Sequence, residues 1–386
     1  MCRKSLFVLL AVMLLLLPGM VFARGGAEQA TEDSYDAWMR FAEVGPYQPE
    51  VEDWDAIHAA AIEEPPMVIY ANTSRAFPQV EKFNEIYGLD VEMLNIRSAA
   101  LNERLRREYD AGIHTAGVAM LANLPDVYQQ LMVERDALTN YVPRDLQERI
   151  VERDMEPLLI HRYSVDTWYY KPENPGEAPY ENIWELTTER FRNRIATLSP
   201  AESSGIVNFM ISVVDRSDWM AEQYQDFFGE PIELTTENAG YEWIKRFLAN
   251  DVRIMAGTRD VAEAVTNADP PFIGRGTQSV YRDVIEGLYD FEIDTEILPT
   301  MLSDRPIAMG SFTRSPNTAK LLIRYLTSQE GGEPWWGADF PVDPQVQTSG
   351  PMADLTLSSF TRLWTIPLED SLTLGPDVTD FWLIHE

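Results

Sequence analysis

The stretch MVIYANTSRAFPQVEKFNEIYGLDVEMLNIRSAALNERL, residues 67–105, decides the fold class of this chain. It opens with a short β-rich run over 67–71 and a polar turn. A helical segment follows, and its apolar residues share one face: Val80, Phe83, Ile86 and Tyr87. Gly88 stands where a C-cap glycine ends many helices, residues 89–94 predict a second strand, and an amphipathic helix begins near Ala99. This order of strand, helix, strand and helix predicts an α/β fold with a parallel sheet.

Both turns of this stretch are polar, and each follows a strand. Because parallel sheets bind ligands at the carboxyl ends of their strands, we expect both turns to face a binding crevice. The first turn offers an amide, hydroxyls, a cation and backbone N–H groups that would cradle a polar or anionic ligand: Asn72, Thr73, Ser74 and Arg75. The second turn repeats the arrangement with Arg97 and Ser98. Helix capping is the alternative role for the hydroxyl-bearing residues.

The chain is long enough for two lobes of ordinary domain size, with 386 residues. Further strands are predicted over 117–123 and 195–198, each followed by a helix. The run EPLLIHRYSVDTWYY, residues 156–170, is β-rich and unusually long. We interpret it as a crossing from one lobe to the other.

Polar and aromatic residues beyond the opening stretch give further candidates for ligand binding: Ser203, Ser204, Gly205, Tyr169, Tyr170, Arg275 and Tyr281. The first three would present hydroxyl and N–H groups at a helix start, where glycine lets a ligand approach the backbone; a plain loop is the alternative. Strand alternation turns only one of the two adjacent tyrosines toward a cleft, and a core position is the alternative for both.

The first residues have the pattern of a secretory signal peptide. Arg3 and Lys4 precede an unbroken apolar run over 6–17, and Val21-Phe22-Ala23 forms a small-residue cleavage site. The apolar run is short for a membrane anchor, which is the alternative. We therefore expect residues 1–23 to be removed after Ala23 and the protein to act in the periplasm, without a lipid anchor because the single cysteine, Cys2, lies before the run.

The composition excludes several function classes. The chain has 62 Asp and Glu residues against 31 Lys and Arg, a net charge of −31, which disfavours nucleic acid and anionic membranes as partners. The four histidines have no metal-ligand spacing, and no phosphate loop or nucleophile elbow is present. We therefore expect no cofactor, no bound metal and no catalytic residues.

Five segments, taken together and in order, resemble the extracellular solute-binding proteins of ABC importers, in the iron(III)-type branch. They are VIYANTSR, RSAALNERLRREYDAG, GVAMLANLPDVYQQL, PYENIWELTTERFRNRIATLSPAESSG and SPNTAKLLIRYLTSQEGG. The last of these is similar to a helix with the pattern P-N-x-A-K … S-x-E-G in that branch. The resemblance covers the chain from about Trp54 to about Pro344.

The resemblance implies the two-lobe periplasmic binding protein fold of type II, with a ligand cleft between the lobes. It places lobe 1 over 67–163 and 298–329, lobe 2 over 164–297, an N-terminal extension over 24–66 and a C-terminal tail over 330–386 that packs on both lobes. It also implies a non-enzyme that delivers a small-molecule ligand to a permease in the inner membrane. We expect a monomer.

One departure from the branch bears on the cargo. Its iron-binding members ligate the metal with two adjacent tyrosines of lobe 2 and an acidic or His residue of lobe 1. The matching segment here, residues 272–281, has one tyrosine, and Asn72 and Ser74 stand at the first turn. We therefore expect an oxygen-rich or anionic small organic cargo. Ferric iron or another metal ion, a sensory role, and an exported hydrolase acting on sugars remain alternatives.

Overall fold

The computed structural model describes residues 34–201, 203–350 and 353–386. The expected signal peptide and its cleavage site lie outside the described residues, as do the first residues of the expected N-terminal extension. No helix of the described part combines the length and the apolar composition that a membrane span requires.

The opening stretch forms the parallel sheet that its sequence predicts. Strand β1 (Met67–Ala71) lies between β2 (Val91–Asn95) and β3 (Ala116–Met120), parallel to both. Helix α3 (Phe77–Tyr87) connects β1 to β2, and α4 (Ser98–Asp110) connects β2 to β3. The α/β prediction for this stretch is confirmed.

Helix α3 ends at the predicted C-cap glycine, and the residues of its apolar face differ in burial. Gly88 takes the left-handed conformation at its C-cap, with φ of 65°. Of the four apolar residues predicted to share a face, Val80 and Phe83 are buried and Tyr87 is half-buried, whereas Ile86 is 49% exposed. The 3.6-residue repeat carries Ile86 to the rim of the apolar stripe, where no second layer of protein covers it.

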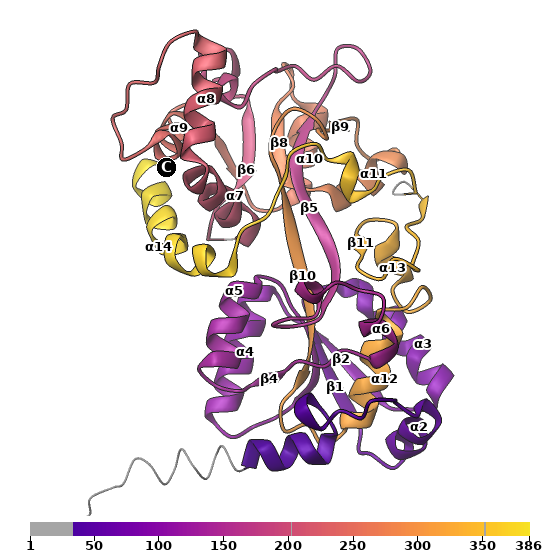
Figure 1. Cartoon of the computed structure of the whole chain (residues 1–386). Helices are drawn as coiled ribbons and strands as arrows, with labels where there is room; N and C mark the ends of the chain where they lie inside the picture. The colour runs from indigo at the N-terminus through magenta and orange to yellow at the C-terminus, as the bar shows by residue number, and fades with distance from the viewer. Residues whose placement is uncertain (1–33, 202, 351–352) are drawn as a thin grey trace, which may run out of the picture.

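Two long strands join the two halves of the molecule, as Figure 1 shows. Strand β5 (Ile160–Tyr170) and strand β10 (Thr300–Gly310) pair antiparallel over six residue pairs, from Met301 with Asp166 to Pro306 with Ile160. One end of β10 pairs with β3, and the far end of β5 pairs with β8 (Ile273–Thr277). The resulting strand order is β2-β1-β3-β10-β5-β8-β6-β7. The predicted crossing over 156–170 is therefore confirmed, and β10 is the returning strand.

The second half of the molecule is also an α/β unit. Strand β6 (Ile195–Leu198) lies between β7 (Arg253–Met255) and β8, parallel to both. Its helices are α7 (Ser204–Asp215), α8 (Ser217–Phe228), α9 (Ala239–Leu248), α10 (Thr258–Asn267) and α11 (Tyr281–Ile285). The sequence analysis did not predict α8.

Most of the remaining elements are short; the longer ones are the helix over 34–42, α2, α12 and α14. Those before β10 are a helix over 34–42, α2 (Trp54–Ile62), α5 (Leu124–Val127), the π-helix η3 (Tyr128–Val133), β4 (Leu138–Thr139), α6 (Arg144–Gln147) and β9 (Glu292–Ile293). Those after it are α12 (Pro316–Leu326), α13 (Glu333–Trp336), β11 (Phe340–Pro341), β12 (Leu363–Trp364) and α14 (Leu368–His385). The 3-10 helices that the chain also contains are η1 (Gly45–Tyr47), η2 (Ser74–Ala76), η4 (Glu152–Asp154), η5 (Ile183–Thr187), η6 (Glu189–Phe191), η7 (Gln278–Val280) and η9 (Leu357–Ser359).

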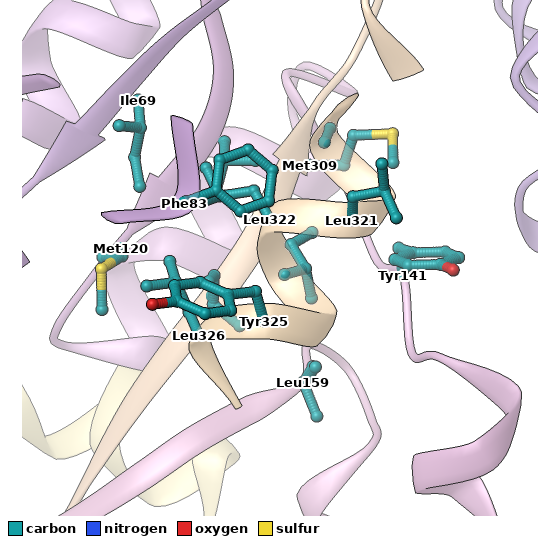
Figure 2. Packing of buried hydrophobic residues seen from close by; sticks show 14 of the residues in the cluster. Ile69, Phe83, Met120, Tyr141, Leu159, Met309, Leu321, Leu322, Tyr325 and Leu326 are labelled. Carbon is teal, nitrogen blue, oxygen red and sulfur yellow. The ribbon is translucent and has the colours of Figure 1, made fainter. Parts of the chain in front are cut away.

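Each half has its own hydrophobic core. In the first half, α12 packs across the sheet, and Leu322 and Tyr325 meet Ile69, Phe83 and Met309 (Figure 2). A separate cluster in the second half gathers around α7 and α9, and it includes Trp168, Phe209 and Trp243. Because apolar burial dominates folding energetics, two separate cores joined by two strands allow each half to move as a unit.

The C-terminal segment contributes to both halves. Trp335 and Trp336 of α13 lie in the first core. Val378 and Trp382 of α14 lie in the second core, and α14 also contacts α5 of the first half. In Figure 1, α14 runs along the left side of the molecule between the two halves. It therefore forms a third connection, beside β5 and β10.

Candidate functional site

A cavity of about 570 Å³ lies between the two halves. Its volume falls within the range of roughly 300–1,000 Å³ that is usual for small-molecule sites. The first half supplies α4 and the residues after β3, the second half supplies the start of α7, and α14 closes one side. The described polar lining residues are Ser98, Asn102, Asn123, Asp126, Asp166, Ser203, Ser204, Asn208, Arg305, Ser371, Thr379 and Asp380.

The N-terminus of α7 points at the cavity, because Ser203, Ser204 and Gly205 line it. The carboxylate of Asp166, on β5, lies against this first helical turn. A Cβ atom added to Gly205 would come within 2.4 Å of Asp166 Oδ2, so glycine is required for this approach. A carboxylate at a helix N-terminus is stabilised by the helix dipole.

Asp166 is 7% exposed and lines the cavity floor. Its Oδ2 atom accepts a hydrogen bond from Ser303 Oγ at 2.5 Å, across the β5–β10 pair. No described residue donates to Oδ1 or forms an ion pair with this carboxylate.

Of the described residues that line the cavity, one is basic: Arg305 of β10. Its guanidinium is half-buried and has no hydrogen bond or ion pair with any described residue. It also lines a neighbouring cavity of about 280 Å³, together with Arg153 and Asp304. Burial raises the pKa of Asp304, and the positive charges of Arg153 and Arg305 act in the opposite direction. Arg305 is thus a cation that lines both cavities; Asp304 lies close enough to interact with its charge but forms no ion pair with it.

Of the predicted residues at the two turns, Ser98 lines the cavity and the others do not. Asn72 lies behind it, donating from Nδ2 to Ser98 Oγ at 3.2 Å. Thr73 caps the 3-10 turn that follows β1, through a hydrogen bond from Arg75 N to Thr73 Oγ1 at 3.3 Å. For Thr73, the capping alternative is therefore what the structure shows.

Arg75, Ser74 and Arg97 also lie away from the cavity. Arg75 turns toward the opposite side of the hinge strands, with Nη1 at 4.0 Å from Asp339 Oδ2, and burial lowers its pKa. Ser74 and Arg97 are exposed. The crevice rule located the correct edge of the sheet, but the side chains at a turn diverge, and only a fraction of them points toward the ligand side.

The two adjacent tyrosines are both in the core of the second half, so the prediction that one faces the cleft is wrong. Tyr169 is fully buried, its ring stacks on Phe291 at 4.8 Å, and its hydroxyl donates to the carbonyl of Thr277. Burial raises its pKa well above the ordinary value of 10. The Tyr170 hydroxyl donates to Glu292 Oε2 at 3.2 Å. The two faces of β5 are both covered at this end: Tyr169 packs in a cluster with Phe291, and Tyr170 packs in another with Tyr180.

Arg275 and Tyr281 also lie outside the cavity lining. Arg275 is 1% exposed, with its guanidinium 4.0 Å from the ring centroid of Phe209, and burial lowers its pKa to about 10. The negative charge of Asp166 acts in the opposite direction on this pKa. Tyr281 is half-buried against the cluster around Tyr169. The sequence pattern did not distinguish these inward positions from cleft positions.

Several lining residues were not predicted from the sequence. Asn123 follows β3 at the same sheet edge as the two predicted turns, so the crevice rule would have found it. Asp166 and Arg305 are polar residues within the long crossing strands, and charged residues in such a strand are a usable signal. The lining residues of α14 carry no recognisable sequence signal, because the sequence did not reveal that this helix returns to the cleft.

Comparisons with known proteins agree on the fold. No protein-family model and no curated protein matches the sequence. Among solved structures, the ferric binding protein from Campylobacter jejuni superposes with a TM-score of 0.64 at 17% identity, over 83% of this chain and 99% of that chain.

Two other solved structures give the same result. Iron-bound HitA from Pseudomonas aeruginosa has a TM-score of 0.63 at 13% identity, over 81% of this chain and 99% of that one. An ABC transporter protein from Clostridium perfringens has a TM-score of 0.59 at 15% identity, over 82% of this chain and 99% of its own. This chain therefore has the two-lobe fold of the periplasmic solute-binding proteins.

Proposed function

We propose that this chain is the substrate-binding subunit of an ABC importer, which captures a small solute outside the inner membrane and delivers it to the permease. One observation carries the proposal: a cavity of about 570 Å³ lies between two halves. Each half has its own core, and β5, β10 and α14 connect the two halves. Such an arrangement favours closure of the lobes around a ligand and release when they open. No chemical step is needed for this role.

The cellular setting is part of the same proposal. The signal peptide pattern supports export with cleavage after Ala23, and we propose a periplasmic monomer that carries no cofactor. We also propose the lobe boundaries 67–163 with 298–329 for lobe 1 and 164–297 for lobe 2. The two cores support this division. Strand β10 pairs with β5 over residues 301–306 and with β3 over residues 307–309, so the chain passes from one half to the other within this strand.

The alternatives are supported by no specific contact. The names of two similar structures refer to iron, but the described residues contain no group of three or more His, Cys, Asp or Glu side chains that could hold a metal ion. The two adjacent tyrosines are used by the core. A glycoside hydrolase needs two carboxylates that flank the substrate. Three carboxylates line the cavity, but Asp126 and Asp380 are exposed and Asp166 accepts a hydrogen bond from Ser303, and no observation assigns two of them to acid and base roles.

Lobe closure can be measured by pulsed electron spin resonance distances between spin labels. The sole cysteine, Cys2, precedes the expected cleavage site, so introduced cysteines are the only labelling sites in the mature chain. The exposed positions Glu92→Cys on β2 and Glu222→Cys on α8 form a cross-lobe pair, and Glu92→Cys with Arg107→Cys forms a control pair within one lobe.

We expect the cross-lobe distance to shorten with at least one solute from a panel of amino acids, aminophosphonates, sugars, polyamines, inorganic phosphate and ferric citrate. The control distance should stay constant. A cross-lobe distance that no member of the panel changes would contradict a solute-capturing role.

A further inference from the structure

The cavity between the lobes contains two opposite charges that do not neutralise each other. Asp166 and Arg305 both line it, yet they form no ion pair with each other or with any other described residue. Burying a charge is costly unless a partner compensates it. The charge of Asp166 acts on the buried Arg275, and that of Arg305 acts on Asp304, but neither contact is an ion pair. Asp166 Oδ1 and the Arg305 guanidinium therefore keep hydrogen-bonding capacity for a molecule that enters the cavity.

The position of Asp166 makes it a site for a cationic group and not for an anion. It is 7% exposed, Ser303 satisfies Oδ2, and Oδ1 accepts no hydrogen bond from a described residue. Its carboxylate lies against the first turn of α7, so it already takes the favourable position at the positive end of that helix. A free anion bound to the same N–H groups would meet a negative charge within a few ångströms and would be repelled.

The register of the hinge strands sets the spacing of the two charges. Asp166 pairs with Met301, and Arg305 lies four residues further along β10 on the same face, because strand side chains alternate with a period of two. Four residues of extended strand span about 13 Å between Cα atoms. The arginine side chain shortens the gap between the charged groups, but the gap is too long for a direct ion pair.

We propose that the cavity binds a small zwitterion, whose ammonium group donates to Asp166 and whose acid group accepts from Arg305. The inference rests on the proposed solute-binding function. It narrows the sequence-based expectation of an oxygen-rich or anionic organic cargo, which drew on neutral donors and on the cation Arg75. None of the described lining residues is aromatic, so a primary ammonium with N–H donors suits the site better than a quaternary one. The exposed carboxylates Asp126 and Asp380 at the rim add negative charge that favours the ammonium end of an approaching ligand.

Isothermal titration calorimetry with a graded series of compounds tests the proposal. The probes are the ω-amino acids glycine, 4-aminobutanoate and 6-aminohexanoate, with butanoate, butylamine, putrescine and inorganic phosphate as single-charge or like-charge comparisons. The variants are Asp166→Asn, which keeps the shape and the Ser303 contact, and Arg305→Gln. Asp226→Asn and Arg107→Gln, on the exposed faces of α8 and α4, make the same chemical changes away from the cleft.

We expect one chain length of ω-amino acid to bind more tightly than every single-charge compound. Each cleft variant should weaken this binding about 10- to 100-fold, as the loss of a charge-assisted hydrogen bond does, and the control variants should not. Unliganded melting temperatures of all variants, measured in parallel, show whether a lost affinity reflects unfolding.

Three results would overturn the inference. One is tighter binding of butanoate or phosphate than of any ω-amino acid, and another is an ω-amino acid affinity that neither cleft variant changes. The third is the absence of binding by the whole series. If another class of solute then closed the lobes in the spin-label experiment, the proposed importer function would be supported and the proposed zwitterion binding would be contradicted. If no solute closed the lobes, both the importer function and the zwitterion binding would be contradicted.

Discussion

The contact between Gly205 and Asp166 allows a direct test of how the cleft is built. In Gly205→Ala, the new Cβ would lie 2.4 Å from Asp166 Oδ2 and 2.8 Å from its Cγ, where ordinary contacts begin at 3.4 Å. The carboxylate must therefore move by about 1 Å. Asp166 is a short side chain on a central strand, so this shift breaks its 2.5 Å hydrogen bond with Ser303.

The expected loss of stability follows from two opposing contributions. A hydrogen bond to a charged group contributes about 1.5–3 kcal/mol. Replacing glycine by alanine within a helix returns about 0.5–1 kcal/mol, because the unfolded glycine has more conformational freedom to lose. We therefore expect Gly205→Ala to lower the free energy of unfolding by about 1–2 kcal/mol.

Urea unfolding of four proteins measures this: the wild type, Gly205→Ala, Asp166→Ala and the double variant. In the Asp166→Ala background the carboxylate is gone, so Gly205→Ala should become stabilising by about 0.5–1 kcal/mol. The coupling energy between the two positions should be about 1.5–3 kcal/mol. An additive cycle, with a coupling energy near zero, would refute the claim that this glycine exists to admit the carboxylate.

Three further outcomes can be checked independently. Burial and the adjacent charge of Arg162 lower the pKa of His161 from its ordinary 6.5 to about 3, so the fold favours the neutral ring. The contribution of the neutral ring to stability is therefore complete above pH 6.5 and is lost as the pH falls from 6.5 toward 3. Between pH 6 and pH 4 the wild type should lose about 1.4 kcal/mol per pH unit more than His161→Gln in urea unfolding, and equal slopes would contradict this. Tyr169→Phe should reduce stability by about 0.5–1.5 kcal/mol, since it removes the hydrogen bond from the tyrosine hydroxyl to the Thr277 carbonyl. Titration calorimetry should give an unchanged cargo affinity, and a changed affinity would place Tyr169 in the site. The intact mass of the exported protein should correspond to a chain that begins at Arg24 without acylation, and a retained Cys2 with added acyl mass would disprove cleavage after Ala23.

The sequence predicts the elements of this fold better than the directions of its side chains. The residues of β1, α3 and β2 show their periodicity locally, so a short window suffices. The crossing strand β5 was recognisable because eleven consecutive β-rich residues are unusual, whereas α14 was not, because its packing on α7 depends on residues more than 150 positions away. A helix held by such distant contacts needs no strong local pattern of its own.

The candidate site shows the same limit at the level of single residues. The rule that ligands bind at strand ends led to Ser98, and the pattern of hydroxyls and glycine before a helix led to Ser203, Ser204 and Gly205, all of which line the cavity. Whether a residue on a turn points into the cleft or across the hinge depends on backbone angles that composition does not encode, as Arg75 shows. Tyr169 illustrates the second difficulty: an aromatic residue on a strand suits both a core and a cleft, and only the neighbouring layers distinguish them.

The position of helix α14 has a consequence for the rate at which a bound molecule would leave the cavity. Its first turns form one wall of the cavity, while Val378 and Trp382 hold its other side in the core of the second half. A bound molecule can leave when α14 parts from α5 together with the opening of the lobes. We therefore expect residence time to follow the rate of this concerted parting, so that dissociation is slow relative to diffusion even for a ligand of modest affinity. In an importer, the solute would then be released only while a contact with another protein keeps the two lobes open.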